Sequence, residues 1–292
     1  MKRYIPLIIT LCFLLQGCSV SPEPAQIAAT TLPVYEFTSR LCEGTGITVT
    51  RLVTESVSCL HDYTLQVGQM RAIEGADTVV ISGAGLEGFL EDALHSADNI
   101  IDASHGIELL CPDEDHHHDH DDHGHHHEND PHIWLSPVHA AAMAKNICDG
   151  LSARYPGFAG TFAENLTGLL TDLEDLAEYG KAQLSGLSCR DIVTFHDGFA
   201  YFADYYDLHI LQAVEEESGS EASAAELIEL IQLVEKHDLP AIFIETNGTD
   251  AAAMIICAET GAEVFTLDMA MAGNSYFNAM YRNIDTLKEA LE

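Results

Sequence analysis

The chain has 292 residues, of which 47% are apolar and 20% are charged, a composition typical of globular domains. Its 47 acidic and 12 basic residues give a net charge of −35. Nucleic acid is therefore excluded as a partner, because contacts with phosphates require basic patches. The length favours about two domains.

The N-terminus is predicted to direct export. Lys2 and Arg3 precede an apolar run from Ile5 to Leu15, which is too short to cross a hydrocarbon layer of about 30 Å. A basic start followed by a short apolar core is typical of a secretory signal, and we assign this signal to residues 1–17.

The end of this run suggests a lipid anchor. Leu15-Gln16-Gly17-Cys18 resembles the bacterial lipobox, in which cleavage precedes the cysteine and its thiol carries a diacylglyceryl group. A plain signal peptide with an incidental cysteine is the alternative. We assign residues 18–30 to a tether, since prolines and polar residues favour an extended linker. These features predict a lipoprotein on the extracytoplasmic face of a bacterial cell membrane, without indicating the type of cell envelope.

Residues 31–155 are predicted to form an N-terminal lobe in which strands alternate with helices. Such alternation favours a parallel sheet with helical crossovers. Strands are expected at 47–53, 77–82 and 99–102, and helices at 65–75 and 86–95.

A histidine-rich loop interrupts this lobe at residues 113–130, which have the sequence DEDHHHDHDDHGHHHEND. A segment of this composition cannot build a packed core. Imidazole and carboxylate groups bind zinc, copper and nickel, so we expect several weak, accessory metal sites. A solvated loop without function is the alternative. The eight candidate ligands are His116, His117, His118, His120, His123, His125, His126 and His127.

Residues 156–187 are predicted to form one long linking helix, because their leucines recur at helical spacing. A C-terminal lobe is expected at residues 188–292. Its strands are predicted at 191–195, 208–214, 241–244 and 263–267. One helix is predicted between the first two strands and ends near residue 206, and two further helices are predicted at 222–237 and 276–291. The predicted fold class is α/β, with two lobes that each contain a mainly parallel sheet flanked by helices. The long, rigid helix joins them, and a ligand site is expected in the cleft between the lobes.

The cysteines provide no recognisable zinc knuckle, because none forms a CxxC pair. Beyond the signal and the anchor, six cysteines allow 15 disulfide connectivities, and free thiols are the alternative. They are Cys42, Cys59, Cys111, Cys148, Cys189 and Cys257.

Four residues outside the histidine-rich loop stand where strands or loops lead toward helices. They are His61, His132, His196 and Asp268. Each histidine alone would be an ordinary hydrogen-bonded residue. Together, three imidazoles and one carboxylate can complete a tetrahedral zinc shell. A zinc peptidase is not favoured, because no HExxH motif is present.

The same residues lie in segments that resemble the metal-binding lipoproteins of high-affinity zinc and manganese ABC importers, the ZnuA/TroA-like family. The resemblance covers nearly the whole mature chain. Its motifs are His61-Asp62-Tyr63, Gly85-Leu86-Glu87, DPHIWLSP at 130–137, FHDGFAYFADYY at 195–206, AIFIE at 241–245 and SYFNAMYRNIDTLKEAL at 275–291.

The resemblance implies metal coordination by His61, His132, His196 and Asp268. The resemblance implies Glu at the third position in manganese members and His in zinc members, so His196 favours zinc. Chemistry agrees, because replacing a carboxylate by an imidazole favours zinc over manganese. Leu60 stands where the family often has Pro, which leaves open the loop path and a role for Cys59. Glu245 and Asp62 are secondary carboxylate candidates, and Asp62 and Asp197 are expected to structure their loops.

The implied function is to capture zinc and deliver it to an ABC permease driven by a separate ATPase. The protein is expected to be a monomer. It is not expected to be an enzyme, because a closed four-ligand site has no open position for water. Three alternatives are a manganese-binding member of the same family, a zinc-buffering or adhesin lipoprotein without transport, and a zinc enzyme with only three protein ligands.

Overall fold

The computed structural model describes residues 26–55, 60, 63–94, 97, 99–110, 129–214, 223–246 and 250–292. Several predicted features lie outside these residues. They are the signal segment and tether up to residue 25, Cys18, Cys59, His61, Asp62, Cys111 and all eight histidines of the histidine-rich loop.

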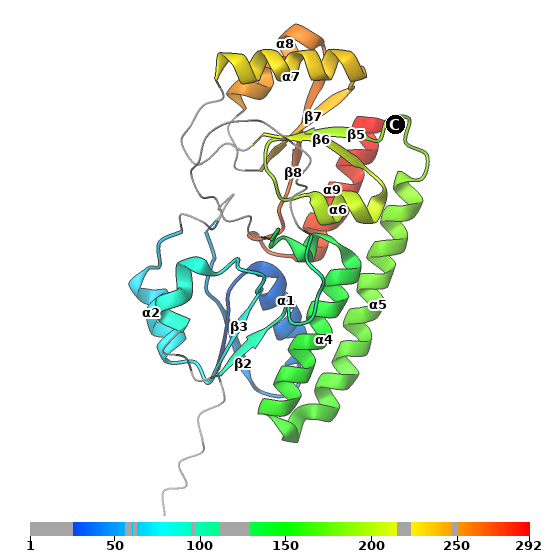
Figure 1. Cartoon of the computed structure of the whole chain (residues 1–292). Coiled ribbons are helices and arrows are strands. Elements are labelled where there is room, and N and C mark those ends of the chain that lie inside the picture. Colours follow the sequence, from blue (N-terminus) through cyan, green and yellow to red (C-terminus); the bar gives the residue numbers. More distant parts are fainter. Residues whose placement is uncertain are drawn as a thin grey trace, which may run out of the picture.

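Two four-stranded parallel sheets form the framework (Figure 1). The first has the order β2-β1-β3-β4 and the second β6-β5-β7-β8, so the two sheets share one topology. The strands are β1 (Gln26–Ala29), β2 (Thr48–Arg51), β3 (Thr78–Ile81), β4 (Ile100–Asp102), β5 (Asp191–Thr194), β6 (His209–Ala213), β7 (Ala241–Glu245) and β8 (Glu263–Leu267).

Helices cover both sheets, as expected for parallel strands. They are α1 (Leu32–Leu41), α2 (Val67–Glu74), α3 (Glu91–Leu94), α4 (Pro137–Arg154), α5 (Ala159–Leu184), α6 (Ala200–Tyr206), α7 (Ala224–His237), α8 (Ala251–Thr260) and α9 (Tyr276–Leu291). Short 3-10 turns occur at Gly88–Leu90, Ile133–Leu135 and Pro156–Phe158. Within the described residues, no helix combines the length and apolarity that a membrane span requires.

Helix α5 packs along the side of the molecule, against α1 and α4 in one half and α6 and α9 in the other (Figure 1). Its 26 residues extend about 39 Å at 1.5 Å per residue. Buried residues of both halves belong to one continuous core, which includes Phe37, Trp134, Leu173 and Tyr276. Separate apolar clusters lie between the first sheet and α2 and α3, and between the second sheet and α7 and α8. The predicted α/β fold with two lobes and a long helix is therefore confirmed.

The structure differs from the sequence-based expectation at Gln26–Ala29. These residues lie within the segment assigned to the tether, but they form β1, which pairs with both β2 and β3. The strand is only four residues long, and its last three residues are buried. Its short apolar run follows directly on a proline-containing segment, and nothing local distinguishes it from a linker. The sequence analysis also did not assign α1 or α8.

The four cysteines within the described residues are free thiols: Cys42, Cys148, Cys189 and Cys257. Burial raises the pKa of the Cys42 thiol to about 12, so this side chain is neutral and packs as a small apolar group.

A buried carboxylate joins the carboxyl ends of β1 and β3. Glu87 accepts hydrogen bonds from Thr30 Oγ1 at 2.7 Å, Ser82 N at 2.7 Å and Gly83 N at 3.0 Å. Gly83 has a φ of +82°, and a side chain there would overlap Asp102 and Ser104. The Gly85-Leu86-Glu87 motif therefore fixes the loops at this edge of the first sheet.

The Glu87→Gln substitution tests this buried acid. Burial raises the pKa of Glu87 to about 7 despite its three hydrogen bonds, so the folded protein retains a proton that the unfolded chain releases above pH 4.5. The contribution of this group to the unfolding free energy therefore decreases as the pH rises from about 4.5 to 7. Measured by urea unfolding, the wild-type protein should lose about 2–3 kcal/mol relative to the Gln variant between pH 5 and pH 8. A difference between the two proteins that stays constant, or grows, would contradict the assignment.

Candidate metal centre

His132 is held by an acidic residue two positions before it. Asp130 Oδ1 accepts hydrogen bonds from both the backbone N and the ring Nδ1 of His132, each at 2.8 Å. Both side chains are nearly buried, with exposed fractions of 12% and 8%. Because a carboxylate only accepts hydrogen bonds, Nδ1 carries the ring proton and Nε2 of the neutral ring keeps its lone pair. The 3-10 turn at Ile133–Leu135 then leads into α4.

His196 has the same kind of partner, supplied by a neighbouring strand. The residue follows β5, and its Nδ1 lies 2.8 Å from Oε1 of Glu245, the last residue of β7. The side chain of Glu245 is 7% exposed. The ring Nε2 of His196 is buried and has no hydrogen-bond partner among the residues that the structure describes. An unpaired buried nitrogen is unfavourable, so this atom is the clearest sign of an expected ligand.

The two histidine rings pack edge to face, although one lies before α4 and the other follows β5. Their centroids are 5.3 Å apart, at an interplanar angle of 83°. Gly198 makes this packing possible, because a Cβ at this position would lie 2.7 Å from the His196 ring and 2.4 Å from the Met269 side chain. Two imidazoles, each with a carboxylate on Nδ1, therefore meet where the two halves of the molecule pack together.

The electrostatics around the rings favour a cation. Burial lowers the pKa of His196, but the hydrogen bond and charge of Glu245, with the charges of Asp197 and Asp130, outweigh it and raise the pKa overall. Burial also raises the pKa of Asp197, with a further contribution from the charge of Asp130. Asp130 Oδ2 and Glu245 Oε2 are buried and have no hydrogen-bond partner in the described part of the chain. This concentration of acidic groups lacks a neutralising lysine or arginine among the ion pairs of the described residues.

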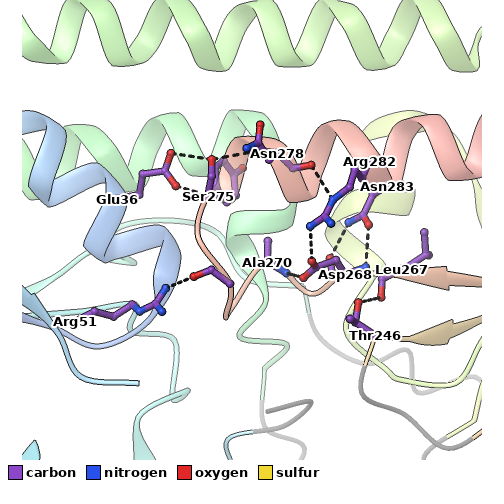
Figure 2. Close-up of polar contacts among 12 residues, drawn as sticks. Glu36, Arg51, Thr246, Leu267, Asp268, Ala270, Ser275, Asn278, Arg282 and Asn283 are labelled. Atoms are coloured by element: carbon purple, nitrogen blue, oxygen red, sulfur yellow. Dashed lines mark hydrogen bonds and ion pairs between the residues drawn. The ribbon is translucent and has the colours of Figure 1, made fainter. Parts of the chain in front are cut away.

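Asp268 follows β8, as expected from the sequence, but its carboxylate is turned to other partners (Figure 2). Oδ1 accepts a hydrogen bond from Ala270 N at 2.8 Å, and Oδ2 lies 3.1 Å from an Arg282 guanidinium nitrogen. The Asn283 side chain accepts a hydrogen bond from Asp268 N through Oδ1 and donates one from Nδ2 to Asp268 O. Within the described part of the chain, no three histidine, cysteine or acidic side chains form a group that could hold a metal ion. The structure thus brings His132 and His196 together and does not bring Asp268 to them.

Asp268 is nevertheless connected to the His132 loop by the residues that follow it. Trp134 Nε1 donates to Met269 O at 2.8 Å, and the Trp134 ring lies 5.3 Å from the His132 ring. The hydroxyl of Tyr276 donates to Trp134 O at 2.8 Å. The segment after β8 therefore packs directly against the segment that carries His132.

The role of Asp130 was not predicted from the sequence, and Glu245 was predicted only as a secondary ligand. The spacing Asp-x-His, which lets an aspartate bond the backbone two residues later, was the available signal for Asp130. For Glu245, the signal was its position at the end of a strand next to the one that precedes His196. Recognising it required the strand order, which the sequence does not state.

A family model described as "Zinc-uptake complex component A periplasmic", ZnuA, matches residues 27–290. The chain belongs to this family. The resemblance stated from the motifs is therefore confirmed, and the family is that of a transport component. The match includes His61, His132, His196 and Asp268, and it begins inside β1.

Relatives of this ZnuA-family chain include the zinc-binding lipoprotein AdcA of Streptococcus pneumoniae, which is 32% identical over 311 aligned residues. The alignment covers 100% of the chain but 62% of AdcA, so the chain spans less than two thirds of that relative's length. A putative metal-binding protein of Treponema pallidum is 30% identical over 297 residues, which cover 95% of the chain and 93% of that protein.

Solved structures with the same fold include a crystal structure of ZnuA, with a TM-score of 0.79 and 28% identity over 92% of the chain and 100% of ZnuA. The Zn(II)-bound ZnuA-like domain of Streptococcus pneumoniae AdcA has a TM-score of 0.76 and 30% identity. That match covers 92% of the chain and 99% of the domain. The two-lobe fold of the family is thus common to this chain and to a zinc-bound relative.

The ring protonation described above can be measured in the metal-free protein. Long-range 1H–15N NMR spectra should show protonated Nδ1 and unprotonated Nε2 in the neutral rings of His132 and His196. Glu245→Leu should shift His196 toward a mixture of tautomers, because its Nδ1 proton loses its acceptor. His132 serves as the internal control, since its partner is Asp130. A predominantly Nε2-protonated His196 in the wild-type protein would contradict this arrangement.

Proposed function

We propose that this protein captures zinc outside the cytoplasm and delivers it to an ABC importer. The observation that carries the proposal is the buried Nε2 of His196, which has no hydrogen-bond partner among the described residues and belongs to a ring packed edge to face with His132. Both rings have the carboxylate-bound Nδ1 that is typical of histidines that bind zinc. Membership in the zinc-uptake family and the zinc-binding names of its relatives support the choice of metal.

His61 and Asp268 are the proposed remaining ligands. His61 lies within the family match, and Tyr63, two residues later, is fixed by hydrogen bonds with Glu55 and Gln69. Asp268 would exchange its contact with the exposed Arg282 side chain for the cation, an exchange of low cost because exposed ion pairs contribute about 0–1 kcal/mol. Glu245 is the orienting partner of His196 in this proposal.

The imidazole at position 196 is the reason to propose zinc over manganese. Nitrogen ligands favour zinc, whereas manganese prefers oxygen ligands. A set of three imidazoles and one carboxylate would also fill a tetrahedral zinc shell and leave no position for a reactive water, so we propose a binding protein and not an enzyme.

The remaining parts have supporting roles in this proposal. Cys18, the last residue of the lipobox-like sequence, is the lipid anchor on the extracytoplasmic face. The segment 18–30 was assigned to the tether, but Gln26–Ala29 within it belong to the first sheet. Lobes at 31–155 and 188–292 flank the linking segment 156–187. The histidine-rich loop collects zinc near the site, and a monomer docks on a membrane permease that a separate ATPase drives.

Zinc titrations of variants test the binding site. In a chain whose residues 111–128 are replaced by a short linker, one zinc ion should bind per protein. His196→Ala and Asp268→Asn should each weaken the affinity by about 100-fold or more, which exceeds the 10–100-fold typical of residues behind the ligands. His209→Ala, an exposed histidine at the start of β6, and Asp285→Asn on α9 are matched controls that should bind normally. Unchanged tight binding by His196→Ala would eliminate the proposed site.

Growth measurements test delivery separately from binding. In a host without other zinc importers, deletion of the gene should abolish growth in chelated medium, and added zinc should restore it. The wild-type gene should complement the deletion, whereas one that encodes His196→Ala should not. Normal growth of the deletion strain would leave a buffering or adhesin role in place of transport.

A further inference from the structure

The histidine-rich loop departs from the core at a point that is bonded to the metal site. Leu110 precedes residues 111–128, and Asp130 follows them after Asn129. Asp130 N donates to Leu110 O at 3.2 Å, so the two stems of the loop lie side by side. Asp130 is also the residue whose carboxylate holds His132. One residue therefore serves both as a loop stem and as the partner of a proposed zinc ligand.

A single hydroxyl group completes this junction. Tyr201 Oη accepts a hydrogen bond from Leu110 N at 2.8 Å and donates one to Asp130 O at 2.9 Å. Its donor and one of its acceptor positions are thus used, one on each stem. The Tyr201 side chain is buried, with 1% exposure, and its ring packs edge-on against His139 of α4 at 5.2 Å and 90°. The ring is fixed by packing, so the hydroxyl has a defined position.

Tyr201 is also close in the sequence to the second histidine, His196. It is the second residue of α6, and the short segment from His196 leads directly into this helix. The backbone of Asp130 is thereby tied to the element that follows His196. The distance between the two rings depends on this connection as well as on the core below them.

We propose that Tyr201 is a positioning residue. Its hydroxyl bonds both Leu110 and Asp130, the two ends of the segment 111–128, and thereby keeps Asp130 and His132 in the geometry that zinc binding requires. The proposal rests on the proposed zinc site. Holding the ends of a long segment together has an entropic cost that grows with its length. Eighteen residues, 111–128, lie between Leu110 and Asn129 in the sequence, so holding their ends together carries such a cost. Without the hydroxyl, the hydrogen bond from Asp130 N to Leu110 O alone, among the bonds of the described residues, offsets this entropic cost.

A double-mutant cycle tests the proposal. Tyr201→Phe is made in the full chain and in a chain whose residues 111–128 are replaced by a short Gly-Ser linker. Zinc chloride is titrated against a competing chelator, and Trp134, the single tryptophan of the chain, reports on the site through its fluorescence. Tyr205→Phe is the matched control, because this residue lies on the same helix and contacts Lys181 through its ring. It should bind zinc as the wild-type protein does.

The expected result is an affinity loss of about tenfold for Tyr201→Phe in the full chain, in the range known for residues behind metal ligands. The loss should be threefold or less, on the order of experimental error for such cycles, in the shortened chain. Equal losses in both chains would mean that Tyr201 only supports the core, and no loss in either would mean that the hydroxyl is dispensable. Either result overturns the proposal.

Hydrogen exchange separates this proposal from the zinc assignment. In metal-free protein, the amides of Leu110 and Asp130 should exchange at least about tenfold faster in Tyr201→Phe, because local opening no longer breaks the Tyr201 bonds. The Leu110 amide should exchange faster in both chains, because it loses its acceptor, whereas the Asp130 amide should exchange faster in the full chain and change little in the shortened chain. Unchanged exchange would reject the stem closure even if zinc binds elsewhere, whereas faster exchange without any zinc binding would reject only the zinc site.

Discussion

The central physical constraint is the hydrogen bond between each histidine Nδ1 and a buried carboxylate. Asp130 and Glu245 fix the two rings and hold the ring proton of each on Nδ1. An imidazole without such a partner can exchange tautomers and rotate, and would lose part of its affinity for a metal. The rest of the fold can be understood as the support that these two bonds need. Glu245 reaches His196 because β7 lies next to β5, and Asp130 reaches His132 because the chain turns at Pro131.

That support comes from a core shared by both halves of the molecule. Trp134 and Tyr276 are fully buried, and their hydrogen bonds connect the His132 segment with the segment after β8. Glu36 of α1 accepts a hydrogen bond from Tyr276 N and lies near Ser275, at the start of α9 (Figure 2). Burial raises the pKa of this acid, although the bond to Tyr276, Ser275 and Arg40 oppose the effect. Polar groups of both halves are thus satisfied only when the halves are packed together, which gives the pair of histidines a fixed separation.

Much of this arrangement could be predicted from the sequence, because periodicity and strand-end positions are local properties. The strands β3, β5, β7 and β8 and the helices α7 and α9 were expected within a few residues of their observed positions. The sequence also singled out His132 and His196, which the structure brings together. β1 and α8 were not predicted, since their short or uniformly apolar segments carry no distinctive pattern. The partners Glu245 and Tyr201 depend on strand order and on contacts between distant segments. The same is true of the Arg282 contact of Asp268, which no local pattern could reveal.

The charges around the histidines show why a site of this kind is built from buried acids. Burial and the charge of Asp130 raise the pKa of Asp197, while the charges of His132 and His196 oppose the effect. Asp130 and Glu245 are largely buried, and a buried carboxylate has lost hydration that its hydrogen bonds must replace. A divalent cation between the rings would offset this repulsion, and its binding energy would include the relief of that cost. The same acids would be a poor environment for a neutral or anionic ligand. Acids in this arrangement would therefore favour a small, doubly charged ion at the proposed site.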